Sequence, residues 1–249
     1  MPPDSAAPAP GITEPDFSAI EPNAVVAPSE RLRDVADWGY LLQEVRTLYA
    51  TMPSGGSDPI RRHVREVIEH LNRAVRANPP LATRVRQDKP VTRHFGRALD
   101  NGEAGMLASA IRALTKVRKE LFWQYGYDRM PKSLEQKYAY AEILGPRGPV
   151  IYDSLIIGLV LFAPKTVYPQ HAHTGITESY ICLSGAVSEN HMGVYRPGSL
   201  ILNQPGAEHR ITSQNYEPAL LVYAWAGAPS DLSGQEMTLS RKRRSQKTP

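Results

Sequence analysis

The sequence after residue 149 decides the fold, because short apolar runs follow one another there at close spacing. Residues 150–163 read VIYDSLIIGLVLFA, residues 178–189 read ESYICLSGAVSE and residues 219–227 read ALLVYAWAG. The shorter runs HMGVYR, SLILNQ and HRITS lie between the last two. β-Branched and aromatic residues dominate these runs, and turn residues such as Gly, Pro and Asn separate them. This pattern predicts the strands of a small barrel or sandwich.

Upstream of these strands, residues 29–145 are predicted to be mainly helical. Apolar side chains recur at three- and four-residue steps from Leu32 to Leu48, which is the period of one helix face. Asp58-Pro59 is typical of a helix start, with an N-cap residue followed by proline in the first turn. Three such helical stretches are expected, over about residues 29–52, 58–78 and 102–125.

The two ends of the chain differ in composition from the rest. Residues 1–28 contain seven prolines and no Lys or Arg, and such a composition buries too little apolar surface to fold, so we predict disorder. The last nine residues, RKRRSQKTP, carry five basic side chains. Removing those five charges from the net charge of +4 leaves −1, so the basicity belongs to the end of the chain. We interpret residues 229–249 as a basic solvated tail and expect no nucleic-acid partner.

Composition also bears on the compartment. No apolar stretch of the 249 residues approaches the ~20 residues that a membrane span needs. The first ten residues, MPPDSAAPAP, lack the basic and apolar regions of a secretory signal. Cys182 is the single cysteine, which excludes an intrachain disulfide and a multi-cysteine zinc site. We therefore expect a cytoplasmic protein with no membrane partner.

A group of candidate metal ligands lies within the β region. Residues 168–180 read YPQHAHTGITESY, so His171 and His173 are two positions apart and, on a strand, point to the same face. Glu178 follows after a short bend, and a third histidine, His209, comes directly after a predicted tight turn. Two or three imidazoles and one carboxylate form a site for one divalent transition metal ion that leaves positions open for substrate. Fe, Zn, Mn, Ni and Co all suit these ligands, so the identity of the metal stays open.

This pattern resembles the two sequence motifs of the cupin superfamily, whose six-stranded barrel holds a metal through two histidines, a glutamate and a third histidine. The resemblance implies that the same three histidines and Glu178 are the ligands here. The second motif of the superfamily usually reads Pro-x-Gly-x-x-His. In this chain Gly206 directly follows Pro205, so the turn before His209 is one residue shorter.

A narrower resemblance is to the bacterial cupin-type dimethylsulfoniopropionate (DMSP) lyases. It rests on Tyr168 three residues before the first histidine, on Tyr180 two residues after the glutamate, and on Leu-Ser-Gly at 183–185. The helical N-terminal block also fits the longer members of that family. The resemblance implies an α+β fold in which a C-terminal cupin barrel (a double-stranded β-helix or jelly roll) over residues 146–228 follows a mainly α-helical extension.

The resemblance also implies a reaction, the metal-dependent β-elimination of DMSP to acrylate and dimethyl sulfide. A base removes a proton from the carbon beside the carboxylate, and dimethyl sulfide leaves as a neutral molecule, so no general acid is required. A dication bound to the substrate carboxylate would stabilise the charge that builds up, and would lower the pKa of a phenol beside it. We expect Tyr180 to be the base, with Tyr168 as a second candidate that orients the substrate or shares this role.

The other end of this small zwitterionic substrate is a sulfonium cation, which aromatic faces attract. Tyr223 and Trp225 alternate onto one side of the last predicted strand and are the first candidates to bind it. Trp123, Tyr125 and Tyr127, at the end of the third predicted helix, could close the mouth of the barrel. Each of these aromatic residues could instead pack an ordinary core.

Two other functions stay open at this point. The same four ligands would serve another mononuclear-metal cupin enzyme, such as a non-haem iron dioxygenase, which needs no tyrosine base. A non-enzymatic cupin regulator with a DNA-binding portion is the weaker alternative, because the predicted helices are long and unlike a compact helix-turn-helix. The helical extension could pack on the barrel or support a homodimer, and the sequence does not decide between these.

Overall fold

The computed structural model describes residues 25–52, 55–127 and 130–234. The predicted disordered segment, residues 1–28, lies outside this part of the chain except for its last four residues, which begin strand β1. The basic residues 241–249 also lie outside it.

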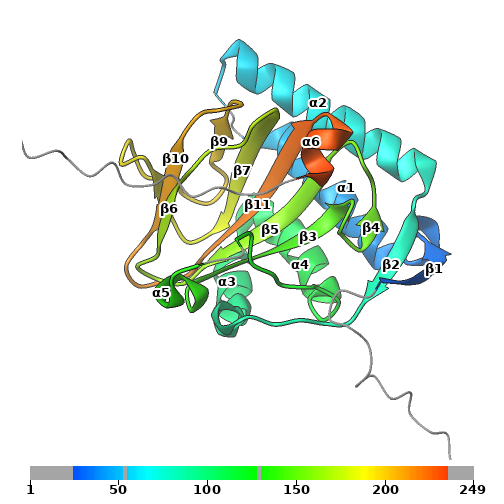
Figure 1. Ribbon diagram of the computed structural model, residues 1–249, viewed down its shortest axis with the longest axis horizontal. Helices are drawn as coiled ribbons and strands as arrows, with labels where there is room; N and C mark the ends of the chain where they lie inside the picture. Colours follow the sequence, from blue (N-terminus) through cyan, green and yellow to red (C-terminus); the bar gives the residue numbers. More distant parts are fainter. Residues whose placement is uncertain (1–24, 53–54, 128–129, 235–249) are drawn as a thin grey trace, which may run out of the picture.

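The strands form two sheets that face each other (Figure 1). The larger one has eight strands in the order β1-β2-β4-β3-β5-β11-β7-β9, and the smaller one has three in the order β6-β10-β8. Among the described strands every neighbouring pair is antiparallel except β3 with β4. The predicted barrel is thereby confirmed. The strands are β1 (Val25–Arg31), β2 (Pro80–Arg84), β3 (Tyr138–Gly145), β4 (Val150–Ile151), β5 (Ile156–Phe162), β6 (Val167–His171), β7 (Ile176–Ser184), β8 (Val187–Glu189), β9 (Leu200–Asn203), β10 (His209–Ser213) and β11 (Ala219–Gly227).

The central strands of the large sheet are buried on both faces, which explains their continuous apolar runs. In β5, Ile157, Leu159 and Leu161 belong to a hydrophobic cluster shared with the helices. Val160 and Phe162, one position away, belong to a second cluster inside the barrel. The two-residue period of a strand thus divides one apolar sequence between two cores. We call the first the outer cluster and the second the inner cluster.

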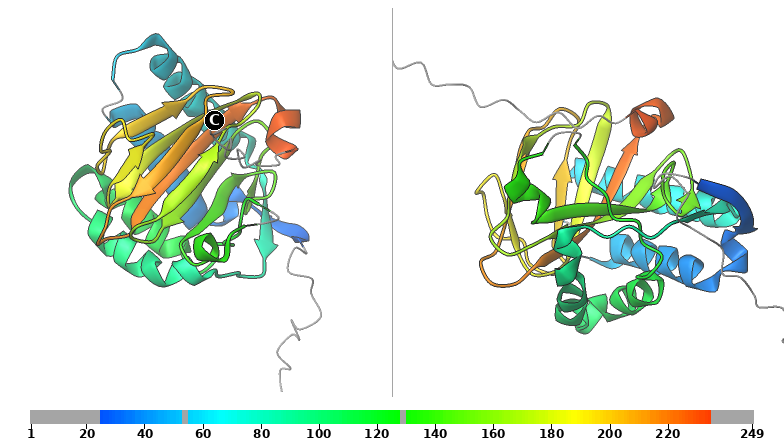
Figure 2. Two further views of the ribbon diagram at one scale, coloured as in Figure 1. Left: turned by 60° about the vertical axis from the view of Figure 1, so that its left-hand side comes forward. Right: turned by 60° about the horizontal axis from the view of Figure 1, so that its bottom comes forward.

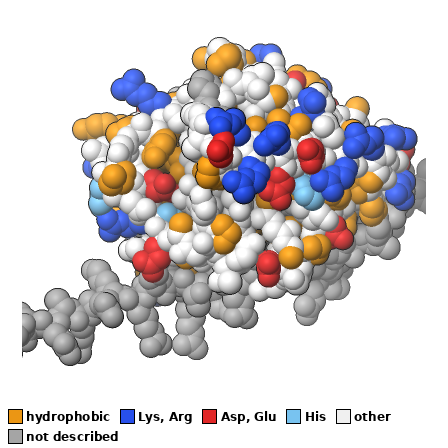
Figure 3. All heavy atoms as spheres, turned by 90° about the horizontal axis from the view of Figure 1, so that it is seen from above, with side chains coloured by type: hydrophobic (Ala, Val, Ile, Leu, Met, Phe, Trp, Pro, Cys, Tyr) orange, Lys and Arg blue, Asp and Glu red, His pale blue; other side chains and the backbone are white. Residues whose placement is uncertain are grey.

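Among the described helices, four lie on the outer face of the large sheet: α1 (Ala36–Thr51), α2 (Asp58–Ala77), α3 (Phe95–Gly102) and α4 (Ala108–Val117) (Figure 2). The short helices α5 (Lys132–Glu135) and α6 (Pro229–Ser233) instead add Leu134 and Leu232 to the inner cluster, so the predicted solvated tail begins with a folded segment. Helix α2 begins at Asp58 as predicted and ends at Ala77, and the residue that follows it, Asn78, has a left-handed φ of 50°. Its solvent side carries basic and acidic side chains next to one another (Figure 3). Within the described part of the chain, no helix is long and apolar enough to cross a membrane.

The predicted third helix over residues 102–125 is confirmed only for α4, Ala108–Val117, and is wrong for the residues on either side of it. Helix α3 ends at Gly102, α4 ends at Val117, and the chain after it is extended. There, the Trp123 amide donates to the Gln87 carbonyl (2.9 Å), and Gln124 forms a β-bridge with a residue of β3. Pairing with distant strands therefore overrides the local helical pattern.

The region expected to be helical, residues 29–145, also contains strands that were not predicted. Strand β1 ends in it, β2 and β3 lie within it, and β3 pairs with β5 along most of its length. The barrel therefore includes Tyr138–Gly145 as one of its central strands.

Candidate metal centre

Three strands of the barrel bring the four predicted ligands together. His171 ends β6, Glu178 lies on β7 and His209 begins β10, while His173 lies in the loop between β6 and β7. Strands β6 and β10 pair so that His209 lies opposite His171. All four side chains are buried, and their ligand atoms lie within 4.8 Å of one another. The shorter turn before His209 does not remove it from the group.

Backbone carbonyls orient two of the imidazole rings. His171 Nδ1–H donates to the carbonyl oxygen of Pro169 (2.9 Å), and His209 Nδ1–H donates to that of Ala207 (3.1 Å). Each acceptor lies two residues before the ring that it holds. With the proton fixed on Nδ1, the Nε2 lone pair of each ring is free to bind a metal ion.

The Glu178 carboxylate is held by two donors that are not candidate ligands. Trp225 Nε1–H donates to Oε1 (2.6 Å), and the Asn203 amide donates to Oε2 (3.2 Å). On the same carboxylate, His173 Nε2 lies 3.6 Å from Oε1 and His209 Nε2 lies 2.9 Å from Oε2. These two buried Nε2 atoms have no hydrogen-bond partner in the structure. Unpartnered imidazole nitrogens around a buried carboxylate are the donor set that a divalent transition metal fits.

The pKa values of His171, His173 and Glu178 agree with that fit, whereas the pKa of His209 shifts the other way. Burial lowers the pKa of His171 to about 4 and also lowers that of His173, so both rings are neutral at pH 7. Burial also acts on His209, but the neighbouring Glu178 carboxylate raises the pKa of this ring. Burial alone would raise the pKa of Glu178, but His173 and His209 outweigh this effect and hold the pKa below its ordinary value. Neutral imidazoles and an ionised carboxylate are the forms that bind metals.

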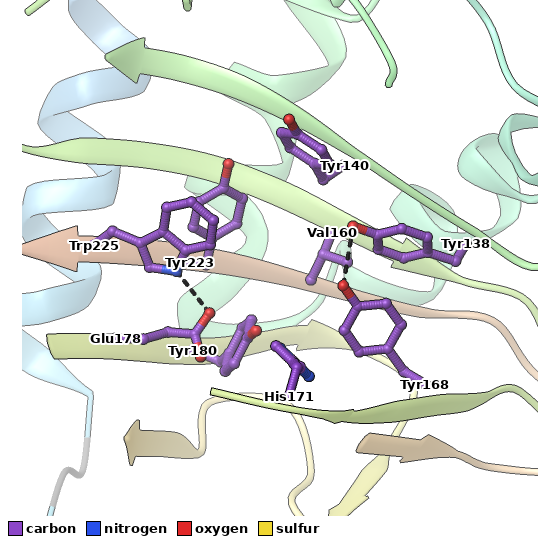
Figure 4. Close-up of a pocket in the computed structure, with 9 residues that line it drawn as sticks. All are labelled: Tyr138, Tyr140, Val160, Tyr168, His171, Glu178, Tyr180, Tyr223 and Trp225. Atoms are coloured by element: carbon purple, nitrogen blue, oxygen red, sulfur yellow. Dashed lines mark hydrogen bonds between the residues drawn. The ribbon is translucent and has the colours of Figure 1, made fainter. Parts of the chain in front are cut away.

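A cavity extends from the ligands into the barrel (Figure 4). Its free volume is about 20 Å³, so it is tight. The lining residues are mostly aromatic and come from β3, β5, β6, β7 and β11: Tyr138, Tyr140, Val160, Tyr168, His171, Glu178, Tyr180, Tyr223 and Trp225.

Both candidate catalytic tyrosines line this cavity. Tyr180 lies two positions after Glu178 on β7, and its ring centre is 6.4 Å from that of His209. The ring centre of Tyr168 is 4.8 Å from that of His171, and its hydroxyl donates to that of Tyr138 (3.2 Å). Burial raises the pKa of both phenols well above 10, and the Glu178 charge raises that of Tyr180 further. A positive charge held by the ligands would act in the opposite direction.

The structure places the aromatic residues predicted to bind substrate in two regions, at the cavity and in the outer cluster. Tyr223 and Trp225 line the cavity, with ring centres 5.0 Å apart. The Tyr127 ring centre lies 6.0 Å from that of Tyr168, next to the cavity. Trp123 instead belongs to the outer cluster, where its ring packs against Phe95 at 5.1 Å.

Tyr125 packs against both the outer and the inner cluster, and its hydroxyl donates to the Glu135 carbonyl (2.8 Å).

Sequence reasoning missed four residues of the site. Tyr138 and Tyr140 lie on β3, where the alternation Tyr-Ala-Tyr-Ala was available as a strand signal. Val160 lies in a run that is apolar throughout, so the sequence does not show to which face of the sheet its side chain points. Asn203 reaches Glu178 because β9 pairs with β7 in the register that places these two residues opposite each other.

The helices contact the strand that carries Glu178 from behind. Ser179, the next residue, points to the outer face, and its hydroxyl lies 2.8 Å from Tyr49 Oη of α1. The same hydroxyl lies 2.8 Å from His63 Nε2 of α2. Ser179 and His63 are buried, and burial lowers the pKa of His63 to about 4, so its ring is neutral. The helical region is thereby connected to the strand that carries Glu178, one of the candidate ligands.

Comparisons with known proteins point to one family. Residues 62–221 match the family model described as dimethylsulfoniopropionate lyase. The chain is 53% identical to the putative dimethylsulfoniopropionate lyase DddL of Cereibacter sphaeroides over 214 residues, which are 86% of this chain and 92% of that protein.

Two solved structures show the same fold at low identity. The DMSP lyase DddQ of Ruegeria pomeroyi superposes with a TM-score of 0.60 at 19% identity, over 82% of this chain and 96% of DddQ. A chain from the crystal structures of the DMSP lyases RdDddP and RnDddQII gives 0.60 at 18% identity, over 83% and 98%. From the family match and the identity to DddL, the chain belongs to the dimethylsulfoniopropionate lyase family and is a carbon–sulfur lyase with a cupin barrel.

Proposed function

We propose that this chain cleaves DMSP to acrylate and dimethyl sulfide at the four-ligand group, with Tyr180 as the base. One observation carries the proposal: the phenols of Tyr180 and Tyr168 line the same buried cavity as His171 and Glu178. A cupin site that binds a metal for another purpose does not need a phenol in that position.

His171, His173, Glu178 and His209 would hold one divalent transition metal ion, with Fe, Zn, Mn, Ni and Co as the candidates. When bound, such an ion neutralises the substrate carboxylate and stabilises the negative charge that develops beside it. A cytoplasmic location and a homodimer stay predictions from the sequence.

Tyr180, deprotonated to the phenolate beside the positive charge at the ligands, would remove the proton from the carbon next to the carboxylate. The electron pair of that C–H bond forms the new C=C bond, the C–S bond breaks, and its electrons leave with dimethyl sulfide. The proton stays on the Tyr180 hydroxyl until it passes to water. Tyr168, whose own hydroxyl bonds to Tyr138, would help to orient the substrate.

Tyr223 and Trp225 would place aromatic faces around the sulfonium group, and Tyr127 would support them from the edge of the cavity. A cation over an aromatic face gains about 2 kcal/mol when water is excluded. Burial of the lining residues excludes water here, since Tyr180 and Tyr223 are 5% and 3% exposed.

The test is to supply purified protein with DMSP and to measure acrylate and dimethyl sulfide together, with and without oxygen. We expect the two products in equal amounts, with no requirement for oxygen. Chelation should stop the reaction, and one of the candidate metals should restore it. Fully metallated protein that releases neither product would refute the proposal, and a strict requirement for oxygen would favour a dioxygenase.

A further inference from the structure

Strand β5 forms the part of the cavity wall where Tyr140 and Tyr223 meet. Val160 is the only aliphatic residue among the described residues that line the cavity. It is 5% exposed and lies opposite Tyr140 of β3 in the strand register. In Figure 4 it lies between the row formed by Glu178 and His171 and the tyrosines of β3.

Gly158, two positions earlier on β5, fixes the ring of Tyr223 against this wall. The two residues are opposite each other where β5 pairs with β11. A Cβ atom at position 158 would lie 2.5 Å from Cε1, Cζ and Oη of Tyr223, closer than real atoms approach. Only glycine therefore lets the Tyr223 ring lie where it does. The same ring packs edge-on against Tyr140 at 6.4 Å.

The remaining wall is aromatic and leaves little free space. Tyr138, Tyr140, Tyr223 and Trp225 supply ring faces or edges, and the free volume is about 20 Å³. A substrate whose carboxylate lies at the metal ligands must place its sulfonium group toward these rings. Its alkyl groups then meet the one aliphatic side chain of the wall, Val160.

We propose that Val160 is the residue that determines which alkyl groups on the sulfonium sulfur the enzyme accepts. This inference rests on the proposed function and deepens it, because it assigns the size limit of the substrate to one side chain. In a closely fitting apolar pocket, one methylene group changes kcat/KM by about 10- to 200-fold. Removing the two methyl groups of Val160 creates space for the longer alkyl groups of a larger sulfonium compound.

The experiment compares two substrates, 3-(dimethylsulfonio)propanoate and its diethyl homologue. Both release acrylate when the C–S bond breaks, so one assay measures kcat/KM for each. We expect Val160→Ala to raise the ratio of diethyl to dimethyl kcat/KM about 10-fold or more over the unmutated enzyme. Val160→Ile should instead lower the ratio below that of the unmutated enzyme, with unchanged metal content.

A matched control is available on the other face of the sheet. Val222 of β11 is equally buried, at 1% exposed, but belongs to the outer cluster. Val222→Ala deletes the same atoms without enlarging the cavity, so it should leave the substrate ratio unchanged. Urea unfolding and metal content of all three variants separate a loss of stability from a change of specificity.

Two results would overturn the assignment while the proposed function stands. One is an unchanged ratio in Val160→Ala and Val160→Ile when the unmutated enzyme cleaves DMSP. The other is an equal rise of the ratio in Val160→Ala and Val222→Ala, which would indicate general loosening of the barrel. If the metallated, unmutated enzyme releases acrylate from neither substrate, the proposed function itself fails and this assignment fails with it.

Discussion

The two faces of strand β7 contact different parts of the molecule, although their residues alternate along one short sequence. On the inner face, Glu178 and Tyr180 line the cavity beside the candidate ligands. On the outer face, Ser179 bonds to helices α1 and α2, and Ile181 belongs to the outer cluster. Both faces are buried, so burial does not distinguish them. The distinction is that the inner-face polar groups surround the candidate metal centre, whereas the outer-face hydroxyl of Ser179 joins the strand to the helices.

The comparison predicts that one lost hydroxyl has different effects on the two faces. Tyr180→Phe removes the proposed base from the inner face, and we expect kcat to fall about 10²- to 10⁴-fold while metal content is retained. Tyr49→Phe removes a hydroxyl that contacts Ser179 from behind, and kcat should change less than threefold. Steady-state kinetics and metal analysis check both variants. Similar losses of kcat in both would contradict the distinction between the faces.

A second prediction concerns Glu142, an inner-face acid on β3 that is not a candidate ligand. Burial raises its pKa to about 7, although the Arg147 amide that donates to it acts in the opposite direction. The folded state therefore binds this proton more tightly than the unfolded state. This group's contribution to stability is greatest below pH 4.5 and is lost as pH rises toward 7.

Glu142→Gln removes this titration. Relative to the original protein, the free energy of unfolding of the variant should improve by about 3 kcal/mol between pH 4.5 and pH 8. Urea unfolding at several pH values checks the difference. Glu66→Gln, on the exposed side of α2, should show no such change. A pH-independent difference for Glu142→Gln would contradict the raised pKa.

A third prediction separates two roles of Trp225, whose ring lines the cavity and whose N–H donates to the Glu178 carboxylate. Trp225→Phe keeps an aromatic ring in the cavity but loses the N–H that donates to Glu178. Loss of a partner that orients a ligand typically weakens metal binding about 10- to 100-fold, and we expect a change of this size. Trp123→Phe, the same substitution in the outer cluster, should lower stability and leave metal affinity unchanged. Competition with a metal chelator measures the affinities.

The smallest effect on kcat and metal affinity is expected when the Ser179 hydroxyl of the outer face is removed. Ser179→Ala leaves Tyr49 Oη and His63 Nε2 without their shared partner, which should cost about 1–3 kcal/mol of unfolding free energy. Metal affinity and kcat should stay within threefold of the original values, because no ligand loses a hydrogen bond. A large loss of metal in this variant would show that the two faces are coupled through β7.

Three of the four candidate ligands could be predicted from the sequence because they lie close together along the chain. His171, His173 and Glu178 lie within one short stretch with a single bend, so their side chains stay near one another, although His173 lies in the loop after β6 and not on the strand as predicted. His209 required the superfamily resemblance, since its pairing with β6 joins segments far apart in sequence. The apolar runs that predicted the barrel are long enough to distinguish strands from the amphipathic helices upstream.

Contacts set by long-range pairing could not be predicted in this way. Tyr138 and Tyr140 reach the cavity because β3 pairs with β5, and nothing in their local sequence specifies that partner. Trp123 lies in a stretch with helical spacing, yet its backbone bonds to Gln87, so it leaves the helix and packs in the outer cluster. Asn203 meets Glu178 only through the register of β9 on β7.

Strand β3 has a consequence for how this enzyme can be divided into fragments. It ends at Gly145, where the Gly-Pro-rich turn begins, yet it hydrogen-bonds to β5 and supplies Tyr138 and Tyr140 to the lining of the cavity. A fragment that begins at residue 146 would expose the backbone of β5 as a new sheet edge, which is prone to self-association. The barrel and the segment before it therefore form one cooperative folding unit, and the catalytic half cannot be excised on its own.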